Sequence, residues 1–195
     1  TVRDCFKLDV ERYVRVNFNV VSKAIGKIGG VDIELTQAEA DHLNSTKKNY
    51  YESGSDIQTV HAGTNHLNGD TAMAYARIRK IDSDWKRIER QRAVIQAAIN
   101  QVKNSDIFTL NALADAILPM VQTNLTKAEI TRLMLEVPAF LSEGSKMEQM
   151  TIPTYETCWN SVGVDGRKMI GVDFEANAQI LKEFFYGVSD NNSVQ

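Results

Sequence analysis

Residues 74–92 read AYARIRKIDSDWKRIERQR, a stretch far more basic than the rest of the chain. Acids occur in it only at positions 82, 84 and 89, and its basic residues are Arg77, Arg79, Lys80, Lys86, Arg87, Arg90 and Arg92. The whole chain of 195 residues has a formal net charge of −3 and an isoelectric point near 5.7. General nucleic-acid binding requires a broad basic face, so this balance argues against a nucleic-acid partner. One local basic cluster suits a few phosphates instead.

The first part of this stretch is predicted to be extended. Ile78 and Ile81 are β-branched, and such residues favour strands. Because side chains two apart in an extended segment point to the same side, Arg77 and Arg79 are expected to lie together.

The second part is predicted to begin a helix from about residue 85 to about residue 102, with Ser83 or Asp84 as its cap. Asp84, Arg87 and Gln91 are three and then four residues apart, so they fall in one row at the helix start. The face toward the core is predicted at Ile88, Ile95, Ala98, Ile99 and Val102. A solvated, ion-paired face is predicted at Lys86, Glu89 and Arg90.

Two segments thus bring planar guanidinium groups beside a helix N-terminus. Such forks, together with the N–H groups of a helix start, suit a phosphate or a pyrophosphate. From spacing alone, the alternative interpretation is that these charged residues form ion pairs on a solvent-exposed helix start and bind no ligand.

The rest of the chain alternates between strand and helix patterns and indicates one α/β domain. Residues 12–18 and 31–35 alternate in hydrophobicity like strands, and the helix between them suggests a βαβ-like crossover. Residues 36–39 and 126–129 have the spacing of capping boxes, which predict helix starts.

The last part of the chain is predicted to form a helix, and the two cysteines of the sequence have two possible states. Asp173 is predicted to cap a final helix that ends at Gly187, and the polar residues 188–195 are predicted to form a disordered tail. Cys5 and Cys158 are too far apart for a metal-binding motif. They are either buried thiols or, outside the cell, a disulfide.

Other catalytic motifs find little support. His42, His61 and His66 lack the spacing of zinc ligands, and His66 is interpreted as a turn or cap residue. The sequence contains no GxSxG motif, which argues against a hydrolase of the nucleophile-elbow type.

Residues 66–95, HLNGDTAMAYARIRKIDSDWKRIERQRAVI, resemble the signature of the LytR-CpsA-Psr family, whose members attach glycopolymers to bacterial cell walls. The shared pieces are the HLNG start, a Tyr-Ala-Arg-x-Arg pattern, an Asp-aromatic-x-Arg pattern and a closing Arg-Gln pair, here at residues 66–69, 75–79, 84–87 and 90–91. The resemblance implies one three-layer α-β-α domain over residues 1–187, with a central mixed β-sheet flanked by helices.

The resemblance also implies a phosphotransferase reaction. The substrate would be a teichoic acid or capsule type of glycopolymer on undecaprenyl pyrophosphate, transferred with its phosphate to a hydroxyl of peptidoglycan. Arg77, Arg79, Arg87 and Gln91 match positions of the family's pyrophosphate site, and Asp84 matches its acidic position. Asp84, Arg87 and Arg77 are the residues expected to act in catalysis. Arg15, on the first predicted strand, is a further candidate ligand for the anion.

Mg²⁺ is the cofactor that the resemblance implies. Its family ligands precede this segment, since the resemblance covers roughly the last two-thirds to three-quarters of a family domain. The chain starts with Thr1 and is interpreted as a processed or truncated piece. The intact protein is expected at the extracytoplasmic face of the bacterial plasma membrane, anchored by an upstream transmembrane helix. The alternative function, if the metal ligands are truly absent, is a non-catalytic module that binds a lipid-linked glycan or another partner.

Overall fold

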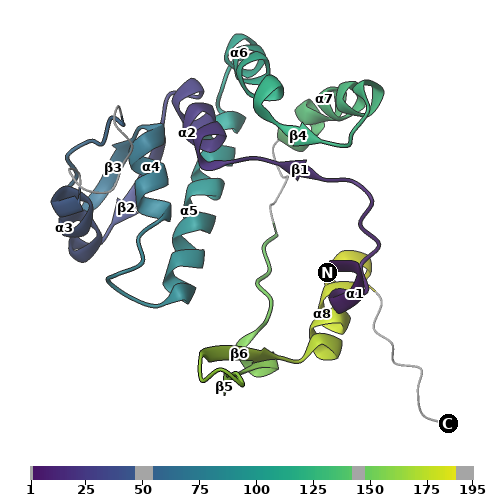
Figure 1. Cartoon of the computed structure of the whole chain (residues 1–195). Helices are drawn as coiled ribbons and strands as arrows, with labels where there is room; N and C mark the ends of the chain where they lie inside the picture. The colour runs from purple at the N-terminus through teal and green to yellow at the C-terminus, as the bar shows by residue number, and fades with distance from the viewer. Residues whose placement is uncertain (1, 47–54, 142–147, 188–195) are drawn as a thin grey trace. The chain divides into compact units, whose positions relative to one another are not determined.

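In the computed structural model, two antiparallel strands, β2 (Val31–Leu35) and β3 (Gly63–Leu67), form the centre of the hydrophobic core (Figure 1). The first, third and fifth residues of β2 are buried and the other two are exposed. This alternation confirms the strand predicted at residues 31–35, with its apolar side facing the core.

The structure describes residues 2–46, 55–141 and 148–187, and the predicted tail at 188–195 lies outside them. Contacts between residues divide the chain into two compact units, residues 14–145 and residues 1–13 with 146–195. The assignment of residues 1–187 to one domain stays a prediction.

Helices cover the β2–β3 pair in the unit of residues 14–145. The 20-residue helix α5 (Asp84–Lys103) packs on β2, and α4 (Gly69–Ala76) packs against α5 and against α2 (Phe18–Lys27). Ser83 caps α5, since its Oγ accepts a hydrogen bond from the backbone N–H of Lys86 at 3.4 Å. The predicted position of this helix and its cap are therefore confirmed.

Gly69 allows α2 and α4 to approach closely. A Cβ atom on Gly69 would lie 1.9 Å from the carbonyl oxygen of Ser22, so no larger residue fits without moving a helix. The Ser22 hydroxyl also donates a 2.6 Å hydrogen bond to Asp70 on α4. Backbone contact and this hydrogen bond together fix the α2–α4 pair.

Both capping boxes are confirmed. The Glu39 carboxylate accepts from the backbone N–H and the hydroxyl of Thr36 at the start of α3 (Gln37–Thr46). Glu129 does the same for Thr126 at the start of α7 (Lys127–Leu141). The segment between α5 and α7 holds α6 (Ile107–Ile117) and the 3₁₀ helix η1 (Leu118–Met120).

The βαβ crossover predicted for residues 12–35 is wrong. Only Val14–Arg15 form a strand, β1, and it pairs antiparallel with β4 (Gln122–Thr123) rather than with β2. Val14, Val16 and Phe18 are each about half exposed, so the alternation in this segment does not mark a buried sheet face.

The unit of residues 1–13 and 146–195 combines α1 (Val2–Phe6), η2 (Tyr155–Thr157), β5 (Cys158–Val162), β6 (Lys168–Val172) and α8 (Phe174–Tyr186). The β5 and β6 strands form an antiparallel hairpin, and α1 packs on α8. Asp173 caps α8 by accepting from the backbone N–H of Ala176, and Gly187 ends it in the left-handed conformation, as predicted. Cys5 and Cys158 are free thiols, so the disulfide alternative is not realised.

The predicted α/β class is confirmed. Strand pairing among the described residues takes the form of three two-stranded antiparallel sheets: β1–β4, β2–β3 and β5–β6. In the part of the chain that the structure describes, no helix is both long enough and apolar enough to cross a membrane.

Candidate functional site

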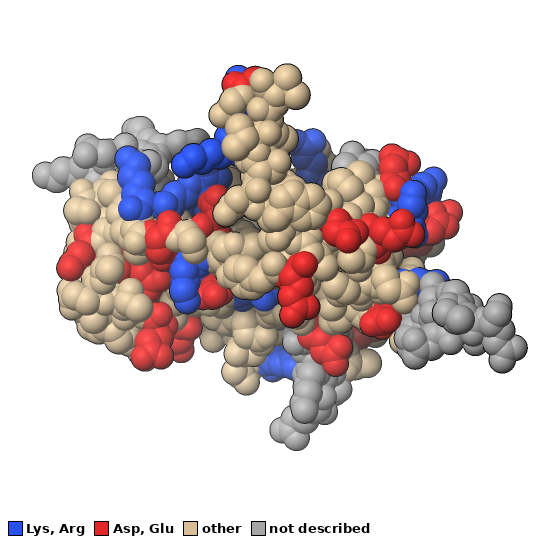
Figure 2. Space-filling model, turned by 90° about the horizontal axis from the view of Figure 1, so that it is seen from below, with Lys and Arg blue, Asp and Glu red and all other residues tan. Residues whose placement is uncertain are grey.

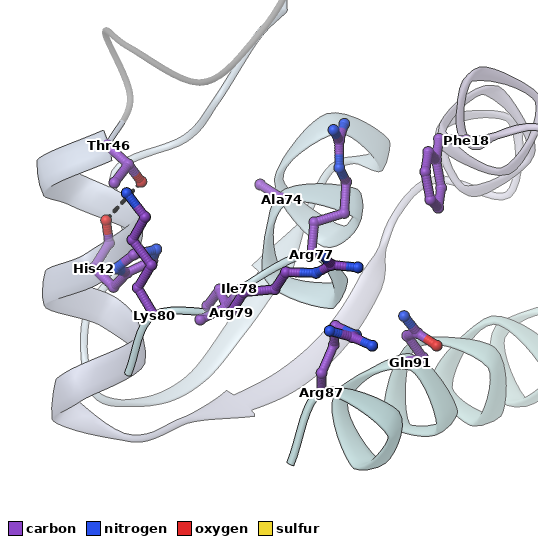
Figure 3. Close-up of a pocket in the computed structure, with 10 residues that line it drawn as sticks. All are labelled: Phe18, His42, Thr46, Ala74, Arg77, Ile78, Arg79, Lys80, Arg87 and Gln91. Carbon is purple, nitrogen blue, oxygen red and sulfur yellow. Dashed lines mark hydrogen bonds between the residues drawn. The ribbon is translucent and has the colours of Figure 1, made fainter. Parts of the chain in front are cut away.

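A hollow of about 390 Å³ opens where α2, α3, α4 and α5 meet, all within the unit of residues 14–145 (Figure 3). Its lining residues are Phe18, His42, Thr46, Ala74, Arg77, Ile78, Arg79, Lys80, Arg87 and Gln91. None of the described residues that line it is an Asp or a Glu. The lining therefore carries several positive charges and suits an anion.

Three side chains from two segments point into the same part of this pocket. Figure 3 shows the guanidinium of Arg79 reaching toward Arg87 and Gln91, which lie one turn apart on α5. The spacing predicted that Arg87 and Gln91 lie on the same side of the helix. It also predicted that Arg79 contributes to the same site. The amide and the two guanidinium groups are donors that match the oxygens of a phosphate.

Arg77 also lines the pocket but is turned another way. It ends α4 as the C-cap residue in a helical conformation, and its guanidinium carbon lies 5.0 Å from the centre of the Phe18 ring. A cation over an aromatic face is attracted by the ring electrons. Arg77 is thus held at the edge of the pocket, beside α2.

The extended run predicted around Ile78 and Ile81 does not form a strand. This segment finds no partner strand, and Arg77 retains helical backbone angles. Ile78 is only 2% exposed and anchors the segment in the core, while Arg77 and Arg79 on either side of it are exposed. The two arginines therefore line one pocket without a sheet to hold them.

Asp84 is the first residue of α5 and is not among the lining residues, but it contacts one of them. Its carboxylate pairs with the guanidinium of Arg87, and its side chain is 74% exposed. The pairing leaves Asp84 in position to orient Arg87. Arg15 lies on β1 and is not among the lining residues, so the geometry of the pocket does not support its predicted role.

Sequence reasoning did not assign six of the lining residues to the site: Phe18, His42, Thr46, Ala74, Ile78 and Lys80. Lys80 directly follows Arg79 in the basic stretch, and this adjacency was an available signal. His42 and Thr46 are one turn apart on α3, far from residues 77–91 in sequence, and no local pattern links α3 to the pocket.

Arg90, predicted on a solvated face, is buried with only 3% of its side chain exposed. Its two terminal nitrogens donate to the two carboxylate oxygens of Asp82, at 2.6 and 2.8 Å, and Nη1 also contacts Glu39 at 3.3 Å. The hydrogen bonds from Arg90 lower the pKa of Asp82. Val94, one turn on, is buried as well, whereas Ile95, predicted to face the core, is 53% exposed. The buried row of α5 thus starts with a charged residue, which a hydrophobic pattern cannot reveal.

His66 is not the turn or cap residue that was predicted. It lies within β3, where Nδ1 is 2.7 Å from Asp32 and Nε2 is 2.7 Å from the carbonyl oxygen of Gly29. Two acceptors around one imidazole favour the form that carries two protons. The hydrogen bond to Asp32, followed by that to Gly29, raises the pKa of His66. His66 thus holds the turn before β2 and is not among the residues that line the pocket.

Tyr75 is a buried titratable residue of α4, next to the lining residue Ala74. Burial raises the pKa of Tyr75 to about 12, so its hydroxyl stays protonated near neutral pH. Within residues 2–46, 55–141 and 148–187, no group of three or more His, Cys, Asp or Glu side chains is placed to hold a metal ion. In Figure 2, Asp and Glu lie among the Lys and Arg side chains of the displayed face.

Comparison with known proteins gives three consistent findings. The model of the LytR_cpsA_psr family matches residues 1–185. The polyisoprenyl-teichoic acid–peptidoglycan teichoic acid transferase TagV of Bacillus subtilis is 28% identical over 157 residues, which are 78% of this chain and 37% of that protein. The transferase of the same description called TagU, from Oceanobacillus iheyensis, is 31% identical over 137 residues, 69% of this chain and 38% of that protein.

Solved structures show the same fold. TagT bound to LI-WTA superposes with a TM-score of 0.68 and 22% identity, covering 96% of this chain and 65% of that one. The crystal structure of B. subtilis TagV gives a TM-score of 0.64 with 24% identity, covering 94% and 67%. The chain spans less than two-fifths of the length of these curated relatives.

Proposed function

Because the chain belongs to the LytR_cpsA_psr family, we propose that it takes part in transferring a glycopolymer from a polyprenyl pyrophosphate carrier to peptidoglycan. The names of the relatives support this proposal, since TagV and TagU are described as transferases of teichoic acid to peptidoglycan. A solved structure of TagT is described as bound to LI-WTA, which supports a glycopolymer substrate for that protein.

The observation that carries the proposal is the meeting of Arg79, Arg87 and Gln91 in one pocket whose described lining contains no acid. A pyrophosphate diester carries two negative charges and several acceptor oxygens. Two guanidinium forks and an amide supply directional donors for these oxygens, in a hollow that partly excludes water. Arg77, at the Phe18 edge, adds a third positive charge.

The proposed reaction moves one phosphoryl group together with its glycan. The oxygen of an acceptor hydroxyl forms a bond to the phosphorus that carries the glycan. The bond from that phosphorus to the bridging oxygen breaks, and the lipid leaves as its monophosphate. The hydroxyl proton passes to a base. Arg79 and Arg87 would stabilise the negative charge that spreads over the phosphoryl oxygens and the leaving phosphate.

Asp84 has two proposed roles, both consistent with its contact to Arg87 and its exposure. Its ion pair with Arg87 fixes the direction of that guanidinium. Because its side chain is also well exposed, the carboxylate can accept a proton from an acceptor that approaches from solvent. Asp84, Arg87 and Arg77 remain the residues proposed to act in catalysis.

A metal ion does not fit the residues at this pocket. Asp84 already pairs with Arg87, and no acid is present in the described lining. The Mg²⁺ implied by the family, with ligands upstream of Thr1, stays a proposal, and no step above is routed through it. Attachment to the extracytoplasmic face of the bacterial plasma membrane stays a proposal of the same kind.

The test is to incubate the chain with a polyprenyl-pyrophosphate-linked glycan and peptidoglycan, with and without Mg²⁺. The expected product is glycan bound covalently to peptidoglycan, with lipid monophosphate released in equal amount. Arg87→Ala should remove product, while Lys86→Ala, a neighbour outside the lining, should not. Binding of the lipid-linked glycan without product in either condition would contradict a catalytic role and support the binding-module alternative.

A further inference from the structure

The segment of residues 77–83 carries Arg79 into the pocket, although within the described part of the chain it pairs with no strand. The buried side chain of Ile78 anchors one point of this segment in the core. A single apolar anchor does not fix the direction of the peptide group that follows it. Another contact must therefore hold the backbone of Arg79 in place.

Arg90 on α5 makes this contact. Its Nη2 donates to the carbonyl oxygen of Ile78 at 3.0 Å and to Asp82 at 2.8 Å, so it holds two points of the segment at once. Its Nη1 donates to Asp82 at 2.6 Å and to Glu39 of α3 at 3.3 Å. Only 3% of the Arg90 side chain is exposed, and hydrogen bonds shielded from water in this way are stronger than exposed ones.

The carbonyl group that Arg90 holds belongs to the peptide unit that leads into Arg79. A peptide unit is planar, so the Cα atoms of Ile78 and Arg79 lie in one plane with this carbonyl group. Fixing the oxygen therefore fixes the point from which the Arg79 side chain starts. In a sheet, a neighbouring strand would supply such a donor, and here a guanidinium supplies it.

Arg90 also connects the two parts of the pocket that carry guanidinium groups. It lies between Arg87 and Gln91 in the sequence of α5, and Figure 3 shows Arg79 reaching toward these two residues. A hydrogen bond from α5 to the peptide unit before Arg79 thereby sets the separation of the Arg79 and Arg87 side chains. Two guanidinium groups bind one pyrophosphate together only at a suitable separation.

We propose that Arg90 is a positioning residue of the pocket, which acts through Arg79 and does not itself touch a ligand. This inference rests on the proposed function, because the effect of Arg90 is expressed as affinity for a pyrophosphate. Ordering the backbone of one residue during binding lowers affinity by a factor of about 5 to 30. Because Arg90 orders Arg79 before a ligand arrives, binding avoids this loss.

The test is a double-mutant cycle on the full chain, with a short-chain prenyl pyrophosphate as the probe in calorimetric titrations. Arg90→Lys keeps the positive charge beside Asp82 and Glu39, but its single nitrogen cannot replace the planar fork that also reaches the Ile78 carbonyl. Its affinity for the probe should be about five- to tenfold lower than that of the unchanged chain. In the Arg79→Ala background, the same replacement should change the affinity by less than about twofold, because the side chain that it positions is gone.

Leu67→Ala is the control for lost stability. Leu67 is fully buried in β3 and is not among the lining residues, so its truncation leaves a cavity away from the pocket. It should lower the free energy of unfolding but change the affinity of the folded chain by less than about twofold. Circular dichroism checks that each variant is folded during the titration.

Asp82→Asn is the second variant, which keeps the test decisive if Arg90→Lys does not fold. It weakens the grip on the Arg90 fork without altering Arg90 itself, and Asp82 is not among the lining residues. The affinity should fall about threefold, and only while Arg79 is present.

Hydrogen exchange tests the same contact without a ligand. The Ile78 N–H donates to the carbonyl oxygen of Tyr75 at 3.2 Å. Relative to the Val94 N–H in the same chain, it should exchange at least about fivefold faster in Arg90→Lys than in Leu67→Ala, because only the first variant loosens this segment locally.

Three results would overturn the inference in distinguishable ways. An equal loss of affinity with and without Arg79 would show that Arg90 acts on the whole fold rather than through Arg79. Unchanged affinity in both Arg90→Lys and Asp82→Asn would show that the segment needs no support from Arg90. Failure of the unchanged chain to bind the probe would remove the proposed pyrophosphate site and with it the role of Arg90, while the exchange of the Ile78 N–H would still report whether Arg90 orders the segment.

Discussion

Arg87 and Arg90 lie one turn apart on α5, yet they belong to two different regions of the molecule. Arg87 lines an open pocket with Arg79 and Gln91, and its partner Asp84 is largely exposed. Arg90 is buried and is held by Asp82 and by Glu39 from α3. Both regions come from the same basic stretch of sequence.

The difference shows what separates a binding arginine from a structural one. Asp82, Glu39 and the carbonyl oxygen of Ile78 accept hydrogen bonds from the terminal nitrogens of the buried arginine, and its Nε is buried too, so no ligand can reach these donors. The pocket arginines keep donors directed at an open hollow. The arrangement of nearby acids therefore decides the role of each arginine, and this arrangement can be tested residue by residue.

The largest effect is expected from Arg90→Met. Removing one partner of a buried ion pair leaves uncompensated charges on Asp82 and Glu39, which costs about 3–5 kcal/mol of the free energy of unfolding. Urea denaturation measures this loss. The double variant Arg90→Met with Asp82→Asn should recover part of it, since one lone carboxylate is gone. A loss below about 1 kcal/mol would show that the cluster is not structural.

The pocket arginines should show the opposite pattern. Arg79→Ala is expected to weaken binding of a prenyl pyrophosphate by about 1.5–3 kcal/mol, the range for hydrogen bonds to charged groups. The free energy of unfolding should change by less than about 0.5 kcal/mol, because Arg79 is exposed. Arg77→Ala should lose less affinity than Arg79→Ala, since Arg77 is engaged with Phe18. Calorimetry measures the affinity. If Arg79→Ala lowered the free energy of unfolding as much as Arg90→Met does, the distinction between binding and structural arginines would be wrong.

The ion pair between Asp82 and Arg90 should also make the free energy of unfolding depend on pH. The pKa of Asp82 is lowered from its ordinary value of 3.8 by the hydrogen bonds of Arg90. Its contribution to stability is therefore fully present above pH 3.8 and is lost as the pH falls through the lowered pKa. The difference in free energy of unfolding between the unchanged chain and Asp82→Asn should shrink as the pH falls from about 6 to about 2.5. A difference that grows in acid would contradict the assigned ion pair.

The smallest effect is expected from Asp84→Asn. An exposed ion pair contributes little to folding, so the free energy of unfolding should change by less than about 0.5 kcal/mol. Without the carboxylate that fixes its direction, Arg87 should bind a prenyl pyrophosphate about two- to threefold more weakly. Tighter binding, as expected if Asp84 only competes with the ligand for Arg87, would contradict the orienting role of Asp84. Transfer activity of the same variant reports on its proposed role as a base.

Local sequence signals account for the parts of this comparison that were predicted. The bounds of α5, its Ser83 cap and the two capping boxes follow from hydrogen bonds between residues three apart. The row of Arg87 and Gln91 follows from helical spacing in the same way. Each of these features depends on neighbours in sequence, which a pattern can display.

The remainder depends on contacts between distant residues. Glu39 reaches Arg90 across 51 positions, and β1 pairs with β4 across more than 100. His42 enters the pocket from α3 for the same reason. Only the folded backbone brings such residues together, so neither the burial of Arg90 nor the place of His42 in the pocket could be predicted from spacing.

The contact between Gly69 and Ser22 has a consequence for how a ligand enters. It sets the separation of α2 and α4, which carry Phe18 and Arg77 at one edge of the pocket. Since these helices cannot move relative to each other without breaking that contact, the backbone at this edge of the pocket is rigid. Admission of a substrate there depends on rotation of the Phe18 ring and the Arg77 side chain, movements that take picoseconds to nanoseconds in exposed residues.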